Sequence, residues 1–266
     1  MGVLNVTPDS FSDGGRLFCA GRPDLGAIED LAQGMLDDGA AILDVGGEST
    51  RPGAEPVSVD EECERVMPVI ERLLDLNTII SVDTRKPEVA IAAIAMGCHM
   101  INDVGGLRGE GMLGAVARGG TAVCIMHMLG EPSSMQRDPQ YVDVVGEVRD
   151  FLAERVDACS EAGIDPTRLL IDPGIGFGKT LNHNLVLLRS LSELKLLGPA
   201  LLVGVSRKRM LGTITGRSVP DRMVASAVAA ALAVQHGADI VRVHDVAATA
   251  DALAMVQAWT APEDVS

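Results

Sequence analysis

The stretch IISVDTRKPEVAIAAIAMGCHMIN, residues 79–102, predicts one complete strand–helix–strand unit. The apolar run Ile79–Asp83 ends on a carboxylate, and a segment with helical spacing, Lys86–Met96, follows it. Gly97 stands where a helix commonly ends in a left-handed residue, before a second apolar run at Met100–Asn102. Near-continuous apolar runs are typical of strands that are covered on both faces, as in a parallel sheet.

The same pattern recurs along the whole chain of 266 residues. Apolar runs that close on a polar residue occur eight times, at Val3–Asn5, Ala41–Asp44, Ile79–Asp83, Met100–Asn102, Val123–His127, Leu169–Asp172, Leu201–Ser206 and Ile240–His244. Segments with helical spacing are found at Leu25–Asp38, Val59–Leu76, Lys86–Met96, Tyr141–Ala162, Asn184–Leu197, Asp221–His236 and Ala247–Trp259. Eight strand–helix units in about 250 residues have the size of a (β/α)₈ TIM barrel. We therefore predict a single α/β domain of this fold over residues 1–266, with a doubly wound open sheet as the alternative.

The composition restricts the class of partner. Asp and Glu number 37 against 22 Lys and Arg, so the formal net charge is −15 and the pI is about 4.7. This acidity disfavours nucleic acid or an anionic membrane, and an aromatic content of 2% disfavours a base-stacking groove. The five cysteines form no Cys-x-x-Cys motif, which indicates a reduced cytoplasmic protein without structural zinc. The longest uncharged stretch, Met223–Ala238, is too short for a membrane helix.

In a (β/α)₈ barrel the chemistry lies at the C-terminal ends of the strands, so the polar residues at these ends form the candidate site. These residues are Asn5, Asp44, Asp83, Asn102, His127, Asp172, Ser206 and His244. Carboxylates such as Asp83 and Asp172 are either ligand partners or N-caps of the following helices. Pro173 disfavours capping by Asp172, because it blocks immediate entry into a helix. His127 has no obvious partner in the sequence, and we expect it to be structural.

Two of the loops that follow these ends carry further signals. The loop Asn5–Gly15 contains Asn5, Asp9 and Asp13, whose hard oxygens are of the kind that Mg²⁺ takes, although a plain surface loop is the other interpretation. The segment Asp172–Lys179 has glycines at alternate positions. It fits neither a Rossmann fingerprint nor a P-loop, which disfavours nucleotide binding by these routes.

Cationic residues occur where barrel enzymes frequently bind a phosphate or another anion. Lys208, one of four lysines, stands between two arginines just after the seventh run. Cations at a helix N-terminus oppose the macrodipole, so this run indicates a function rather than a solvated helix start. Arg242 and His244 are two residues apart in an apolar strand and both point into the barrel, where Arg242 needs an anionic partner from the protein or a ligand. Together with Asn5 they predict a phosphate clamp.

Eight motifs, in this order and across essentially the whole chain, closely resemble those of the dihydropteroate synthases. They are NVTPDSFSDGG (5–15), DVGGESTRPG (44–53), SVDT (81–84), IND (101–103), MHM (126–128), DPGIGFGK (172–179), GVSRK (204–208) and RVHDV (242–246). The resemblance implies a TIM-barrel enzyme of folate biosynthesis, a transferase of an alkyl group. Its reaction joins 6-hydroxymethyl-7,8-dihydropterin pyrophosphate to p-aminobenzoate and gives 7,8-dihydropteroate and pyrophosphate.

The resemblance also implies roles for single positions. The pterin is held by Asp83, Asn102, Asp172 and Lys208, with Met126 and Arg242 against its faces. The pyrophosphate belongs to Asn5, Arg242 and His244 with Mg²⁺, whose protein ligands are Asn5 and Asp13. The p-aminobenzoate site comprises Phe11, Thr50, Arg51, Pro52, Phe177, Ser206 and Lys208, and Gly204 is a further substrate contact. The implied catalytic residues are Lys208, Arg242, His244, Asp83 and Asp172.

The implied mechanism is a dissociative substitution without a protein nucleophile, in which the amine of p-aminobenzoate captures a cationic pterin methylene. The resemblance further implies a homodimer through the late helices, where Ala225–Ala233 is rich in small residues, and competition by sulfonamides. A pterin-binding methyltransferase barrel that uses methyltetrahydrofolate is the alternative, and a non-enzymatic pterin-binding protein is another. The methyltransferase does not require the Ser206–Lys208 run or the phosphate clamp, and loss of a clamp residue would indicate the non-enzymatic protein.

Overall fold

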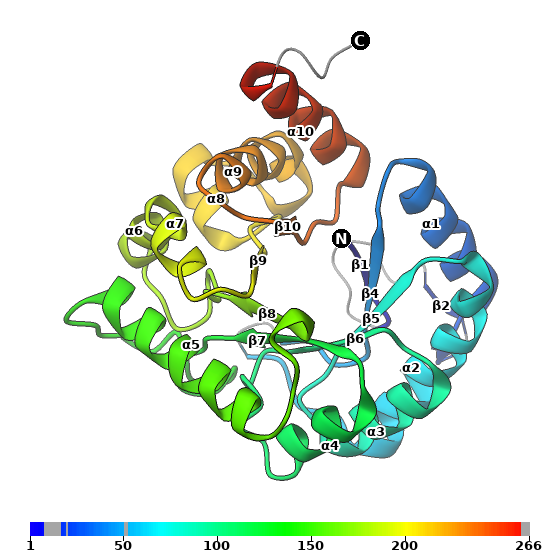
Figure 1. The fold of residues 1–266 in the computed structure, drawn as a ribbon. Helices are drawn as coiled ribbons and strands as arrows, with labels where there is room; N and C mark the ends of the chain where they lie inside the picture. Colours follow the sequence, from blue (N-terminus) through cyan, green and yellow to red (C-terminus); the bar gives the residue numbers. More distant parts are fainter. Residues whose placement is uncertain (8–16, 20, 51–52, 262–266) are drawn as a thin grey trace.

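The computed structural model describes residues 1–7, 17–19, 21–50 and 53–261. Within these residues, eight parallel strands form one curled sheet with helices around its outside (Figure 1). In order around the sheet the strands are β1 Gly2–Asn5, β4 Ile42–Gly46, β5 Ile79–Asp83, β6 Met100–Asp103, β7 Ala122–Met126, β8 Leu169–Asp172, β9 Ala200–Val203 and β10 Ile240–Val241. Neighbours in the sheet are therefore also successive main strands of the chain.

Backbone hydrogen bonds close the sheet between its first and last strands. Val3 N donates to Val243 O at 3.1 Å, and Val243 N donates to Met1 O at 2.9 Å. A parallel bridge between Gly2 and Val243 lies beside them. The predicted (β/α)₈ barrel is therefore confirmed, and the open-sheet alternative is wrong.

Helices connect the strands on the outer side of the barrel. They are α1 Leu25–Asp37, α2 Val59–Leu73, α3 Pro87–Met96, α4 Met112–Gly119, α5 Val144–Glu161, α6 Leu181–Arg189, α7 Leu191–Lys195, α8 Arg209–Thr215, α9 Met223–Gln235 and α10 Val246–Thr260. Three short 3₁₀ turns, Leu74–Leu76, Pro166–Arg168 and Val219–Arg222, and a small antiparallel pair, β2 Phe18–Cys19 with β3 Arg22–Pro23, complete the described elements.

The structure differs from the predicted elements in three places. The predicted helix Asn184–Leu197 is two helices, α6 and α7. The predicted run Ile240–His244 is shorter as a strand, Ile240–Val241; beyond it Val243 pairs with Gly2 through an isolated bridge, and the backbone N–H of His244 donates to the hydroxyl of Ser206 at 3.1 Å. Helices α4 and α8 were not predicted from the sequence. Helix α4 begins after Gly111 at φ +83° without a side-chain cap, so the usual signal of a helix start is missing.

The side chains of each strand alternate between two apolar layers. Outward residues such as Leu43 and Val45 of β4 and Ile80 of β5 pack against the helices in one large cluster. Inward residues form a separate small cluster inside the barrel, made of Met100, Cys124, Leu170 and Leu202. Both faces of the sheet are thus covered, which explains the near-continuous apolar runs. Toward the C-terminal ends of the strands the inward positions become polar, and there the candidate site begins.

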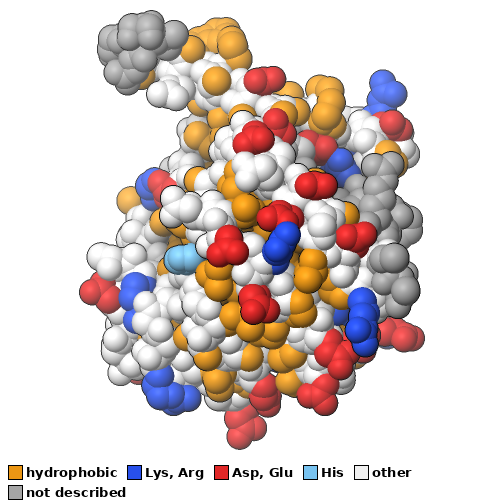
Figure 2. Space-filling model, turned by 90° about the vertical axis from the view of Figure 1, so that its right-hand side faces the viewer, with side chains coloured by type: hydrophobic (Ala, Val, Ile, Leu, Met, Phe, Trp, Pro, Cys, Tyr) orange, Lys and Arg blue, Asp and Glu red, His pale blue; other side chains and the backbone are white. Residues whose placement is uncertain are grey.

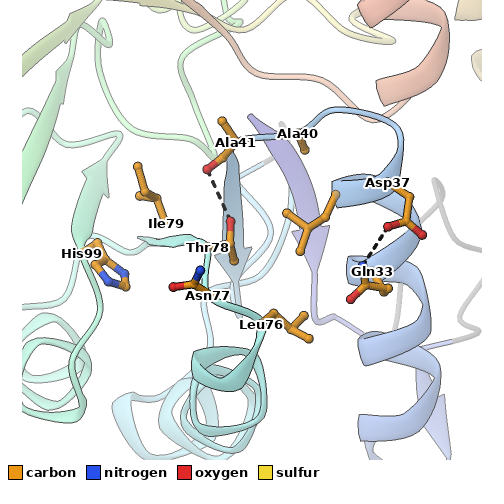
Figure 3. Close-up of a pocket in the computed structure, with 10 residues that line it drawn as sticks. Gln33, Asp37, Ala40, Ala41, Leu76, Asn77, Thr78, Ile79 and His99 are labelled. Atoms are coloured by element: carbon orange, nitrogen blue, oxygen red, sulfur yellow. Dashed lines mark hydrogen bonds between the residues drawn. The ribbon is translucent and has the colours of Figure 1, made fainter.

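The opposite end of the barrel holds an open cavity of about 550 Å³ (Figure 3). Its lining comes from the end of α1, the turn before β4, the turn before β5 and the residue before β6, and comprises Gln33, Leu36, Asp37, Ala40, Ala41, Leu76, Asn77, Thr78, Ile79 and His99. Its carboxylate, Asp37, accepts a hydrogen bond from Gln33 at 2.8 Å. This cavity lies at the starts of the strands and therefore apart from the candidate site.

The outer surface carries the acidity of the chain. Figure 2 shows Asp and Glu side chains scattered over one face, with hydrophobic side chains between them. In the described part of the chain, no helix combines the length and the apolar character that a membrane crossing needs.

Neighbouring residues of β5 test the two-layer arrangement. We expect Ile80→Ala to lower the free energy of unfolding by about 2–5 kcal/mol, because Ile80 is fully buried against the helices and its truncation leaves a cavity. Ile79→Ala is the matched control, and we expect it to cost less than about 1 kcal/mol because Ile79 is 44% exposed. Urea denaturation measures both values. Equal losses for the two variants would contradict the assignment of Ile80 to the outer layer.

Candidate active site

A buried ion cluster occupies the C-terminal end of the barrel. The Arg242 guanidinium, just after β10, donates from Nε to Asp44 Oδ2 at 2.6 Å and from Nη2 to Asp83 Oδ2 at 2.9 Å. Asp44 lies on β4 and is fully buried, and Asp83 ends β5 and is 8% exposed. Arg242 therefore has the anionic partner that the sequence required, and the partner comes from the protein.

Charge and burial oppose each other in this cluster. Burial raises the pKa of Asp83 to about 7, although the positive charge of Arg242 works in the other direction. Burial also acts against the charged form of Arg242, but the carboxylates of Asp44 and Asp83 outweigh it and raise the pKa of Arg242. The guanidinium thus stays charged and holds two strands of the barrel to the last one.

Asp44 was predicted to lie at the barrel mouth as a strand-end residue, but the sequence assigned it no role. Its Oδ2 also accepts a hydrogen bond from Asn102 Nδ2 on β6 at 3.2 Å. Its Oδ1 is buried and has no hydrogen-bond partner among the described residues. A buried carboxylate oxygen without a donor is costly, so this atom is a natural acceptor for a donor group of a ligand.

Asp172 and Lys208 face the loop that follows β8. Asp172 Oδ1 accepts a hydrogen bond from Gly174 N at 2.7 Å, and Lys208 Nζ donates to the carbonyl of Ile175. Burial raises the pKa of Asp172, with the charge of Lys208 opposing it, and burial lowers the pKa of Lys208 to about 8, with Asp172 opposing it. The Lys208 ammonium lies 4.8 Å from the centre of the Phe177 ring and beside Gly204. A cation and an aromatic ring therefore form one wall of the site.

Ser206 holds His244 at the neighbouring wall. The Ser206 hydroxyl lies 3.0 Å from His244 Nδ1 and accepts from His244 N at 3.1 Å. Of the two arginines beside Lys208, Arg207 pairs with Asp245 at 3.0 Å, while Arg209 is exposed on α8. Of these three basic residues, Lys208 is thus the one whose charged group contacts the loop after β8.

The remaining predicted residues divide into placed and undescribed ones. Met126 is buried at the end of β7 in a cluster with Phe177, Asn5 is half-buried at the end of β1, and Thr50 is half-buried after β4. Five candidate positions lie outside the described residues, namely Asp9, Phe11, Asp13, Arg51 and Pro52. The structure therefore brings the predicted pterin residues together and leaves three of the seven residues of the predicted amine subsite undescribed.

Two further groups of residues were missed by the sequence analysis. His127 does have a partner, because Lys179 Nζ lies 2.8 Å from its Nδ1, and this lysine is only 3% exposed. On the other side of the mouth, Glu48 accepts from Lys86 at 2.6 Å and from Arg85 at 3.0 Å. Although burial opposes the charge of Glu48, the hydrogen bond from Lys86 and others lower its pKa. Neither group has a spacing in the sequence that predicts these contacts.

Arg242 allows a test of the ion cluster. We expect Arg242→Met to lower the free energy of unfolding by about 3–5 kcal/mol, because it leaves two buried carboxylates without their cation. The loss should be larger at about pH 8 than at about pH 5.5. Burial raises the pKa of Asp83 and the charge of Arg242 lowers it, so without Arg242 the folded variant keeps a proton at pH 8 that the folded wild type has largely released. Chemical denaturation at both pH values measures the difference.

The matched control is Arg72→Met, which removes an exposed surface ion pair with Glu29. We expect it to cost at most about 1 kcal/mol at either pH. A loss for Arg242→Met that is as small as this control, or that shrinks with rising pH, would contradict the role of the cluster.

Comparisons with known proteins agree with the geometry. A family model described as pterin binding enzyme matches residues 1–244. The chain is 47% identical over 259 residues to the dihydropteroate synthase of Escherichia coli strain K12, covering 97% of this chain and 90% of that protein.

Solved structures match the fold over nearly its whole length. The Yersinia pestis dihydropteroate synthase with a sulfonamide drug superposes with a TM-score of 0.93 at 45% identity, covering 98% of this chain and 93% of that one. The Burkholderia cenocepacia dihydropteroate synthase complexed with 7,8-dihydropteroate gives a TM-score of 0.88 at 45% identity, covering 100% and 92%. The chain belongs to the pterin binding enzymes and, within them, to the dihydropteroate synthases.

Proposed function

We propose that this protein joins 6-hydroxymethyl-7,8-dihydropterin pyrophosphate to p-aminobenzoate, forming 7,8-dihydropteroate and releasing pyrophosphate. The main support for this function is the layer of polar side chains inside the barrel mouth. In this layer Asp44, Asp83, Asn102 and Asp172 lie close to the positively charged side chains of Arg242 and Lys208. The related Burkholderia enzyme is complexed with 7,8-dihydropteroate, the product of this reaction. The Yersinia enzyme carries a sulfonamide drug, and we assign the same class of compound to the amine subsite of this chain.

The polar layer suits a pterin. A pterin edge carries several N–H donors, and the carboxylates of Asp83 and Asp172 and the free Oδ1 of Asp44 are acceptors for them. A site built of buried acceptors rejects analogues that lack the matching donors, since the acceptors then stay unpaired. The buried Met126 at the end of β7 supplies an apolar surface for a face of the ring.

The leaving pyrophosphate requires positive charge and donors. Arg242 uses Nε and Nη2 for the two aspartates, so we assign it to the orientation and neutralisation of charge at the base of the clamp. His244, positioned by the Ser206 hydroxyl, and Asn5 are the donors that we place against the phosphate oxygens. These fixed charges stabilise the negative charge that develops as the bond to the pterin methylene breaks.

We propose Mg²⁺ as the cofactor, with Asn5 and Asp13 as its protein ligands. The amide oxygen of Asn5 is a hard donor, and Mg²⁺ commonly takes one or two protein oxygens together with substrate phosphates. In the described residues no group of three or more His, Cys, Asp or Glu side chains could hold a metal ion, and Asp13 lies outside these residues. When bound, Mg²⁺ would neutralise charge on the pyrophosphate.

The amine then captures the pterin methylene without a protein nucleophile. Phe177 and Lys208 form the wall on which we place the ring and the carboxylate of p-aminobenzoate. Positioning and electrostatics supply the acceleration. A methyltransferase barrel that uses methyltetrahydrofolate remains the alternative, but it does not need the Ser206–Lys208 run, and the chain matches synthases along nearly its whole length.

A component-omission assay tests this function. We expect pyrophosphate release only when the pterin pyrophosphate, p-aminobenzoate and Mg²⁺ are all present, because the amine must trap the pterin and the metal must offset the leaving charge. A coupled phosphate assay measures release with each component omitted in turn. Turnover of methyltetrahydrofolate, with no release from the complete mixture, would favour the methyltransferase instead.

We also propose a homodimer that forms through the late helices. Helix α10 lies beside α9 (Figure 1). Helix α9 exposes Val224, Val228 and Leu232, four residues apart on one face, and α10 exposes Met255 and Trp259. Several small residues of α9, among them Ala227, Ala230 and Ala233, are buried against the barrel instead. The apolar face of α9, rather than its small residues, is therefore the contact that we assign to a second copy.

A charge placed on the apolar face of α9 should separate the two copies of the dimer. We expect Val228→Glu to convert a dimer to a monomer at micromolar concentration, because a charge then enters an apolar interface. Ile91→Glu on α3, where Ile91 is 49% exposed, is the control that should leave the mass unchanged. Analytical ultracentrifugation measures the mass. A monomeric wild type, or a dimer that persists with Val228→Glu, would refute this interface.

We further propose a cytoplasmic location. The described cysteines Cys63, Cys98, Cys124 and Cys159 are free thiols, which suits a reducing compartment. The expectation that neither nucleic acid nor a membrane is a partner rests on the net charge of −15.

A further inference from the structure

Residues 174–178, between β8 and α6, run along the candidate site, and we call them the glycine loop. Gly174, Gly176 and Gly178 have φ values of +65°, +85° and +62°. Left-handed residues at alternate positions turn successive peptide groups to opposite sides, which glycine allows at little cost. The carbonyl groups of this loop therefore face two directions, and each direction needs its own donors.

On the side of the glycine loop that faces the candidate site, Lys208 is the hydrogen-bond donor. Its ammonium donates to the carbonyl of Ile175 and lies 4.8 Å from the centre of the Phe177 ring. The positions of Ile175 O and of the Phe177 ring therefore decide where the Lys208 charge sits. The shape of the glycine loop is thus part of the wall that we assign to p-aminobenzoate.

On the opposite side of the glycine loop, Lys179 is the hydrogen-bond donor. Its ammonium lies 3.0 Å from both Gly174 O and Phe177 O and 2.8 Å from His127 Nδ1. An ammonium has three hydrogens, which match these three short contacts, and His127 O at 3.4 Å is a longer fourth one. Burial lowers the pKa of His127 to about 3, with the charge of Lys179 acting in the same direction, so the imidazole is neutral and Nδ1 is an acceptor. Burial also lowers the pKa of Lys179 to about 7, while Asp172 opposes this.

The glycine loop is pressed against the segment that follows β7. A Cβ atom at Gly174 would lie 1.8 Å from His127 O, and one at Gly178 would lie 2.6 Å from Leu129 O. Carbonyl oxygens from both segments therefore converge on the Lys179 ammonium, with His127 O at 3.4 Å as well. Carbonyl oxygens that point at one place repel each other, and a cation between them offsets this repulsion. His127 is itself fixed by the Phe151 ring, at 4.9 Å between ring centres.

We propose that Lys179 is a positioning residue, whose ammonium acts as an internal cation that holds the glycine loop against the end of β7. It thereby fixes Ile175 O and the Phe177 ring, on which Lys208 rests. Lys179 itself does not face the reacting atoms, because its ammonium is turned to the far side of the loop. This inference rests on the proposed synthase function and assigns Lys179 to the amine subsite.

The two substrates should respond differently to the loss of Lys179. The pterin contacts Asp83 and Asn102 lie on β5 and β6, away from the glycine loop. Asp172 and Lys208 touch the loop at Gly174 N and Ile175 O, whereas Phe177 of the amine subsite is part of the loop itself. We expect Lys179→Met to raise KM for p-aminobenzoate about tenfold and KM for the pterin pyrophosphate less than about threefold. Steady-state kinetics with each substrate varied in turn measure both values. Lys195→Met, at the half-exposed lysine that pairs with Asp239, is the matched control and should leave both KM values unchanged.

Chemical rescue separates a cation from mere packing. Lys179→Ala should have the same elevated KM for p-aminobenzoate, and added ethylammonium should lower it about threefold or more, because the cation restores N–H donors to the carbonyl groups. Tetramethylammonium at equal ionic strength has no N–H donor and should have no effect. If Lys179→Met does not fold, thermal stability of Lys179→Ala should rise with ethylammonium and not with tetramethylammonium.

These outcomes distinguish the inference from the function on which it rests. If the wild-type protein has no synthase activity, the proposed function itself is wrong. An active wild type whose Lys179→Met variant keeps its KM for p-aminobenzoate, or loses affinity for both substrates equally, overturns the positioning role. A Lys179→Ala variant that responds equally to both ammonium salts, or to neither, overturns it as well.

Discussion

The buried pairing of Arg242 with Asp44 and Asp83 is the interaction on which the mouth of this barrel depends. Each of these charges would cost several kcal/mol to bury alone, and only mutual contact offsets that cost. Arg242 follows the last strand and reaches the second and third strands of the sheet, 198 and 159 residues earlier in the chain. The same contact therefore supports closure of the barrel and sets the positions of the carboxylates in the site.

The rest of the polar layer follows from this cluster. Asn102 can donate to Asp44 because Arg242 fixes that carboxylate, and Asp44 keeps a second oxygen without a donor. Below the polar layer the side chains that point into the barrel are apolar, so little water can lie beneath a bound ligand. A flat ligand rich in donors fits between such a floor and the loops above, because its hydrogen bonds are made where competition from water is weak.

The sequence predicts the parts of this structure that rest on local pattern. Apolar runs and the glycines after helices predict eight strands and most helices, whereas α4, which starts at Gly111 without a side-chain cap, gives no such signal. The need of Arg242 for an anion was predictable from its place in an apolar strand, but the identity of the partner was not. His127 and Lys179 are 52 residues apart, and their contact depends on how two loops pack rather than on any spacing. Contacts of this kind follow from tertiary geometry, and periodicity carries no information about them.

The place of the cations also explains how an acidic protein can bind an anion. The chain has a net charge of −15, and acidic side chains are spread over the face that Figure 2 shows. Arg242 lies inside the barrel mouth, and the Lys208 ammonium lies against the side of the glycine loop that faces the candidate site. Surface charges are screened over about 8 Å at physiological salt, while charges in a partly buried site are screened much less. A small pyrophosphate group that enters the mouth therefore meets the internal cations at close range, whereas a long polyanion would have to lie along the acidic exterior.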